Sequence, residues 1–266
     1  QLTSSVGAEI RGDIWTAGWL VESVDVIDDS VSIADTKFSK QPQLTATFKR
    51  HGKAVNLTKS SDLTKFTREI DSTSEVSKGV RFSSDLKAAL PLSESYGSIT
   101  PATLGFARWS EAEIGTTTQN NGYFVYGASL DGELNFEKYG RNGSLHSIVP
   151  RAKILLREPN EDPTIVKFDT SNSANATETV NQLFLDNPIS GGDFVGDTRE
   201  LTLSVESKNI DTAGFEPYKI TVGRTFYMQN RGITLSGTDE TSQQSPLVIE
   251  SKMHLTPEFV WNMRFA

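Results

Sequence analysis

Residues 2–14 read Leu-Thr-Ser-Ser-Val-Gly-Ala-Glu-Ile-Arg-Gly-Asp-Ile, a stretch that changes character at almost every step. The even positions include Leu2, Val6, Ala8, Ile10 and Ile14, whereas the odd positions are polar or glycine. Successive side chains of a β-strand point to opposite faces, so a period of two predicts a strand with one apolar face. This stretch therefore favours a β-fold from the first residues onward.

The last residues of the chain repeat the pattern with larger side chains. Phe259, Trp261, Met263 and Phe265 alternate with smaller or polar residues. Chain ends are usually poorly ordered unless they pair with something. We therefore expect a final strand that belongs to a core.

The middle of the chain is also rich in short alternating segments separated by polar turns. Five segments read as strands: 44–48, 122–127, 153–156, 201–205 and 219–222. Two segments, 62–70 and 177–185, have apolar spacings that predict short helices. The pattern predicts an all-β sandwich, with loops and short helices inserted between its strands.

Composition narrows the class of protein. The 266 residues carry a net charge of -8 with acids and bases interspersed, which argues against nucleic-acid binding. Cysteine is absent, and no apolar run reaches the roughly 18 residues that suggest a membrane helix, so we predict no membrane insertion. The first residue is Gln1 and not methionine, from which we expect a processed, secreted chain.

The two ends resemble those of chaperone-usher fimbrial subunits, in particular the large cysteine-free class whose filament subunit doubles as an adhesin. Ile10-Arg11-Gly12-Asp13-Ile14 is similar to the donor-strand extension of that family, and the penultimate Phe265 stands where its last strand has an aromatic residue. The family usually has tyrosine at that place.

The resemblance implies an incomplete immunoglobulin-like sandwich, with residues 1–14 as a donor-strand extension and 15–266 as the pilin domain. Val6, Ala8, Ile10, Gly12 and Ile14 would enter the groove of the next subunit. The groove itself would be lined by Phe259, Trp261, Met263 and Phe265. The implied product is a head-to-tail homopolymer on the cell surface, assembled by a periplasmic chaperone and an outer-membrane usher, with a host glycan or glycoprotein as a possible receptor.

Enzymatic alternatives find no support in the residues. The three histidines, His51, His146 and His254, lack the close spacing of a metal pair, and no nucleophile elbow or phosphate loop is present. A catalytic triad is spatial and stays open, without positive support. We predict no enzyme activity, no metal and no cofactor.

Two other functions compete with the pilus subunit. A carbohydrate-binding or adhesin sandwich that does not polymerise would use exposed aromatic residues, for which Trp109 and Tyr123 are the candidate receptor contacts. A phage or virion structural subunit would also be rich in strands and free of cysteine. Glycan binding lost on Trp109→Ala would favour the adhesin, whereas an initiator methionine would favour the virion subunit.

Overall fold

The computed structural model describes residues 2–25, 38–52, 54–68, 76–159, 165–169, 179–189, 191–234, 238–254 and 259–266. Within these residues, fourteen strands form one sheet, accompanied by one short helix. The strands are β1 (Leu2–Arg11), β2 (Trp15–Asp25), β3 (Ser39–His51), β4 (Asn56–Thr67), β5 (Val76–Ala89), β6 (Leu92–Glu94), β7 (Gly97–Ile114), β8 (Thr117–Leu134), β9 (Phe136–Tyr139), β10 (Leu145–Pro159), β11 (Thr198–Ile210), β12 (Tyr218–Tyr227), β13 (Val248–His254) and β14 (Val260–Phe265). The helix is α1 (Val180–Leu183).

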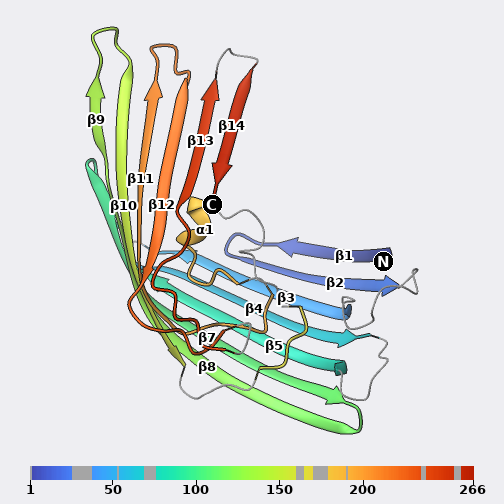
Figure 1. Cartoon of the computed structure of the whole chain (residues 1–266). Coiled ribbons are helices and arrows are strands. Elements are labelled where there is room, and N and C mark those ends of the chain that lie inside the picture. Colours follow the sequence, from blue (N-terminus) through green and yellow to red (C-terminus); the bar gives the residue numbers. More distant parts are fainter. Residues whose placement is uncertain are drawn as a thin grey trace.

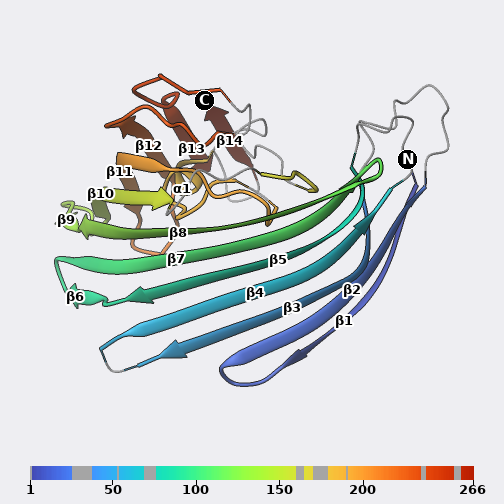
Figure 2. The same ribbon diagram turned by 90° about the horizontal axis from the view of Figure 1, so that it is seen from below.

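The sheet is an antiparallel meander in which neighbours in sequence are neighbours in space. Its order is β1-β2-β3-β4-β5-β7-β8-β10-β11-β12-β13-β14, with β6 beside β7 and β9 beside β10. The sheet is strongly curved, and α1 lies on its concave side (Figure 1 and Figure 2). The all-β prediction is confirmed, but the strands form one curved sheet and not the two packed sheets of an immunoglobulin-like sandwich.

The convex face of the sheet is apolar and exposed. One row of cross-strand neighbours runs over six strands through Ala8, Trp19, Leu44, Leu63, Phe82 and Trp109. A second row continues through Leu130, Ile154, Leu201 and Phe226. The large side chains of these rows are 39–46% exposed, except Leu201, which is partly buried.

The concave face is more polar, and its part over β4 to β12 is covered. Between β10 and β11 the chain folds back over this face, and the described parts of this connection, residues 165–169, 179–189 and 191–197, are called the inner segment below. Beneath it lie charged side chains that water would otherwise solvate, among them Arg81, Lys153 and Arg157, each at most 4% exposed. Three small apolar clusters join the inner segment to the sheet, and in one of them Phe168 stacks on Phe66 with ring centroids 4.5 Å apart.

Local sequence explains α1, while tertiary contacts override the other predicted helix. Thr179 and Gln182 form a capping box, in which the Thr179 hydroxyl accepts from the Gln182 amide at 3.1 Å and the Gln182 side chain accepts from the Thr179 amide at 2.6 Å. The helix predicted over 177–185 is thus confirmed in shorter form, with residues 177 and 178 outside the described part. No helix among the described residues is both long and apolar enough to cross a membrane.

The helix predicted over 62–70 is wrong for its described part, because residues 56–67 form β4. Leu63 and Phe66 satisfy a helical spacing, but they lie on opposite faces of the sheet. Leu63 pairs with Leu44 and Phe82 on the convex side, whereas Phe66 is fully buried against the inner segment. Ile70 lies outside the described residues. The five segments predicted as strands are confirmed in β3, β8, β10, β11 and β12.

Candidate functional site on the concave face

A buried guanidinium holds the inner segment to the sheet. Arg81 of β5 donates to Asp62 of β4 at 3.0 Å and to Asp193 at 2.7 Å, and it also donates to Asp169. Asp193 and Asp169 both belong to the inner segment. Residue 192 is glycine here because a Cβ atom would lie 2.7 Å from the guanidinium carbon. Three carboxylates around one arginine therefore hold two parts of the inner segment against the sheet.

Asp193 organises the backbone on the other side of this cluster. Its second oxygen accepts from the amides of Phe168 and Asp169 at 2.9 and 3.0 Å. Tyr123 of β8 donates its hydroxyl to the Asp193 carbonyl at 2.6 Å and accepts from the Val195 amide at 3.1 Å. Buried charges are tolerated when they are paired and hydrogen-bonded in this way.

The partners of Asp169 determine its protonation. Burial acts to raise the pKa of Asp169, but the hydrogen bond and charge of Arg81, together with Lys40 at 2.9 Å, outweigh it and hold the pKa below its usual range. The carboxylate therefore stays ionised at neutral pH.

A second anchor lies near α1. Lys153 of β10 is 3% exposed and donates to the Phe184 carbonyl at 2.6 Å and to Asp186 at 2.7 Å. Lys87 of β5 donates to the other oxygen of Asp186 at 2.6 Å. Burial acts to raise the pKa of Asp186, but the two lysines outweigh it and lower the pKa. Asp186 thus bridges two strands that are not neighbours in the sheet.

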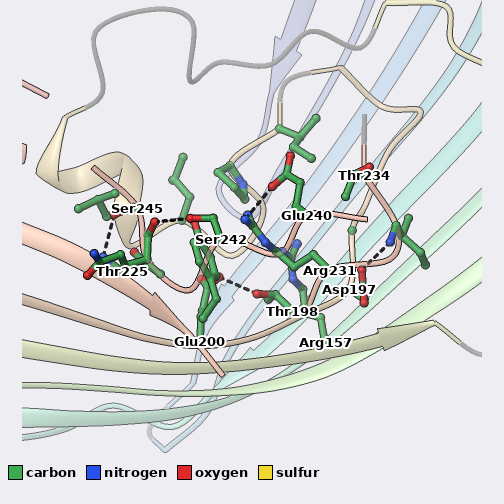
Figure 3. Close-up of a pocket in the computed structure, with 18 of the residues that line it drawn as sticks. Arg157, Asp197, Thr198, Glu200, Thr225, Arg231, Thr234, Glu240, Ser242 and Ser245 are labelled. Carbon is green, nitrogen blue, oxygen red and sulfur yellow. Dashed lines mark hydrogen bonds and ion pairs between the residues drawn. The ribbon is translucent and has the colours of Figure 1, made fainter. Parts of the chain in front are cut away.

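A cavity of about 300 Å³ lies between the sheet, the inner segment and the connection from β12 to β13. Figure 3 shows side chains from these elements converging on it, with Arg231 and Glu240 in contact across its upper side. Its labelled polar lining consists of Arg157, Asp197, Thr198, Glu200, Thr225, Arg231, Thr234, Glu240, Ser242 and Ser245. Apolar groups from the inner segment, including Leu183 and Phe194, complete the lining. Among the described residues, no group of three or more histidine and acidic side chains could hold a metal ion.

The structure places the N-terminal candidates within the chain's own sheet. Val6, Ala8 and Ile10 lie on the convex face of β1, where they pair with Val21, Trp19 and Ala17 of β2. Gly12 and Ile14 lie in and beside the turn between these strands. A Cβ atom on Gly12 would lie 2.6 Å from the Trp15 indole nitrogen, so a contact within the same chain explains the glycine.

The C-terminal candidates lie at the opposite edge of the sheet. Trp261, Met263 and Phe265 occupy the convex face of β14 and pair with Met253, Ser251 and Ile249 of β13. Phe259 precedes the strand and is 56% exposed. Trp261, Met263 and Phe265 share a face, and this face is the outer surface of a curved sheet.

The two candidate receptor contacts are not brought together. Trp109 and Tyr123 lie on adjacent strands, but Trp109 pairs with Gly122 and points to the convex face, whereas Tyr123 points to the concave one.

The anchoring and cavity residues escaped the sequence analysis, although a signal for them exists. In residues 151–157, Arg151, Lys153 and Arg157 share a parity opposite to that of Ile154 and Leu156. Charged residues at alternating positions of a strand indicate one polar face, although they do not indicate what covers it. Their partners, such as Asp186 and Asp193, are distant in sequence and carry no local signal.

Fold and site define the class of this chain: an antiparallel sheet protein with inverted polarity, whose apolar side chains are exposed and whose charged side chains are covered. Comparison with known proteins narrows the class further. The family model for LPS transport system D matches residues 1–266, and the chain belongs to this family.

Curated relatives agree with the family match. The chain is 27% identical to the LPS-assembly protein LptD of Pseudomonas fluorescens over 90% of its own length, and 28% identical to that of Hahella chejuensis over 92%. It is 26% identical to the LptD of Alcanivorax borkumensis over 95%. It covers 31%, 31% and 34% of these proteins, so it spans about a third of the relatives it matches.

These findings correct the functional predictions. The chain is not a chaperone-usher fimbrial subunit, and neither the adhesin nor the virion alternative matches the family. The homopolymer, the pilus chaperone and usher, the host receptor and the extracellular fimbria were predicted as partners and location, and they are wrong for the same reason. The alternating ends led to the wrong family because alternation shows that a strand has two unlike faces but does not show what each face contacts.

Proposed function

We propose that this chain is a membrane-embedded part of a lipopolysaccharide-assembly protein, with its convex face against lipid and its concave face toward a polar interior. The observation that carries the proposal is the inverted polarity of the sheet. Large apolar side chains remain exposed on the convex face, while Arg81, Lys153 and Arg157 are covered on the concave face. In water this distribution would be unfavourable, whereas in a bilayer the convex face needs no further cover.

Strand lengths support this assignment. A strand of roughly 9–11 residues crosses the apolar core of a bilayer when tilted. Strands β1 to β5 have 10, 11, 13, 12 and 14 residues, and β7 and β8 have 18 each. Antiparallel pairing satisfies their backbone groups within the sheet, as hydrocarbon requires. The sequence-based prediction of no membrane insertion considered apolar runs alone, and alternating strands escape that test.

The edges of the sheet fit a longer protein. Within the described residues β1 pairs only with β2, and β14 pairs only with β13. An open edge in lipid leaves backbone donors and acceptors unsatisfied. We infer that further strands of a protein about three times this length cover both edges.

The concave face supplies the chemistry for handling a molecule with a charged and hydroxylated head. Its anchors and cavity present guanidinium, carboxyl, hydroxyl and amide groups away from lipid. Transport and assembly require binding and passage of the lipopolysaccharide, and we propose that the chain performs them without catalysis.

Tryptophan fluorescence tests the orientation directly. Trp15, Trp19, Trp109 and Trp261 are all the tryptophans of the chain, and each is 42–46% exposed. In vesicles whose phospholipids carry bromine on the acyl chains, we expect strong quenching of their emission, because bromine quenches indoles that it contacts. Equal emission in brominated and ordinary vesicles would contradict the proposal.

A matched control uses aqueous quenchers on the same vesicles. Iodide or acrylamide reaches groups in water and should quench the four tryptophans weakly while the chain is folded. Unfolding the protein off the membrane should reverse both results. The assembly role itself is tested by depleting the full-length protein from cells, which should reduce the lipopolysaccharide that antibodies detect on the cell surface.

A further inference from the structure

The cavity on the concave face contains hydrogen-bonding capacity that the described residues leave unused. The guanidinium of Arg157 is 4% exposed, and its one described hydrogen bond runs from Nη1 to the neutral Asn187 side chain at 3.2 Å. Its Nε has no hydrogen-bond partner among the described residues. A buried cation with an unused donor is costly unless a ligand or water satisfies it.

A second guanidinium lines the same cavity. Arg231 lies 3.7 Å from the centre of the Tyr227 ring and pairs with Glu240 at 2.7 Å through Nη2. Its Nε is buried and likewise has no partner within the described residues. Stacking and pairing hold this side chain in place, so its free donor is positioned in advance of any ligand.

Unused acceptors face these donors. Glu200 is 8% exposed, and its described hydrogen bond is the one it accepts from the Thr198 hydroxyl at 2.8 Å. A carboxylate offers about four acceptor positions, so most of the capacity of Glu200 is unused. Figure 3 shows Glu200 and Arg157 rising into the cavity from the sheet, below Arg231 and Glu240.

We propose that this cavity binds a saccharide ring through its hydroxyl groups. A hydroxyl both donates and accepts, so it can satisfy Arg157 and Glu200 together. An anion would be repelled by the charge of Glu200, and a cation would be repelled by the charge of Arg157. The apolar side formed by Leu183 and Phe194 suits the carbon–hydrogen face of a sugar.

The size of the cavity agrees with a small ligand of this kind. About 300 Å³ lies at the lower end of the roughly 300–1,000 Å³ typical of ligand sites, which is enough for one ring and not for an acyl chain beside it. The inference rests on the proposed function, because the saccharide of a transported lipopolysaccharide is the source of such rings on this face.

Saturation-transfer NMR on the purified full-length protein in deuterated detergent tests the proposal. The probes are methyl α-D-glucopyranoside and N-acetylglucosamine, with inorganic phosphate as the anionic control. We expect saturation transfer to the ring protons of at least one sugar and no binding of phosphate. Arg157→Met should weaken sugar binding about tenfold, because it removes a hydrogen bond to a charged group.

A second substitution, at the entrance of the cavity, tests the proposal even if Arg157→Met prevents folding. Ser242 lines the cavity but is exposed, so Ser242→Trp should fill the entrance and abolish saturation transfer without disturbing the core. Thr241→Trp is the matched control, because Thr241 is also exposed but does not line the cavity. It should bind like the parent.

The outcomes distinguish failure of the saccharide site from failure of the proposed membrane orientation. No transfer to either sugar, binding of phosphate in their place, or equal binding by the two tryptophan variants would overturn the saccharide site. Any of these results would leave the membrane orientation intact, because bromolipid quenching measures that orientation without a ligand.

Discussion

At the scale of the residue, the charged side chains of the concave face decide whether the inner segment stays in place. Arg81, 3% exposed, depends on three carboxylates, and Asp193, with a side chain only 1% exposed, depends on Arg81 and two backbone amides. A buried pair contributes little net stability compared with apolar residues, but losing one partner leaves the other charge uncompensated. Single substitutions here should therefore have large effects.

The first prediction concerns Asp193. Asp193→Asn should lower the free energy of unfolding by about 1.5–3 kcal/mol, because Arg81 keeps Asp62 and Asp169 but loses one buried carboxylate, and the amides of Phe168 and Asp169 lose their acceptor oxygen. Glu9→Gln is the control, because Glu9 pairs with Arg11 on the side of β1 away from Ala8, with side chains 47% and 77% exposed, and should cost less than about 1 kcal/mol. Denaturant unfolding in detergent measures both. Similar losses for the two variants would refute the anchoring role.

The second prediction concerns pH and Asp186. Its pKa in the folded protein lies below the ordinary 3.8, so the folded state binds fewer protons than the unfolded state as pH falls. The stabilisation is therefore complete above the unfolded pKa and disappears as pH falls through the folded one. The difference in unfolding free energy between the parent and Asp186→Asn should be constant from about pH 7 to pH 5 and shrink below about pH 4. If the difference in unfolding free energy stayed undiminished down to about pH 3, the stabilisation by Asp186 would not depend on the charge of its carboxylate.

At the scale of the element, each strand separates two environments by parity alone. In β3, Leu44 lies in the convex row between Trp19 and Leu63, while the next residue, Thr45, faces the concave side and lies 3.5 Å from the Gly18 carbonyl. The same arrangement holds on the neighbouring strands. Adjacent positions of one strand thus form natural matched pairs for experiments.

The third prediction uses this pair. Leu44→Arg should destabilise the protein in phospholipid vesicles by about 2–4 kcal/mol, the usual effect of a cation on the lipid face near the middle of a strand. Thr45→Arg adds the same charge on the polar face and should change stability by less than about 1 kcal/mol. Cells that depend on full-length protein with Leu44→Arg should also show less lipopolysaccharide at the surface. Equal effects of the two substitutions would argue against lipid on the convex face.

At the scale of the whole molecule, curvature and the inner segment create the candidate site. The cavity draws its lining from β10, β11, β12, the inner segment and the β12–β13 connection, which are separated by long stretches of sequence. β10, β11 and β12 are neighbours in the sheet, but the inner segment and the β12–β13 connection reach them only because the chain folds back over the concave face. The apolar clusters also combine distant parts of the chain, since Phe66 belongs to β4 and Phe168 belongs to the inner segment.

Local sequence is enough to predict the all-β class, the two end strands β1 and β14, five strands between them, and the alternation of Val6, Ala8 and Ile10 on one face. These properties are local, because side-chain direction in a strand depends on parity and the cap of α1 depends on Thr179 and Gln182. The exposure of the apolar face and the covering of buried charges such as Arg81 and Lys153 follow from the tertiary structure alone. Alternation distinguishes the two faces but is the same whether water or lipid meets either one, and the contacts of Arg81 with Asp169 and Asp193 form only when the chain returns across the sheet.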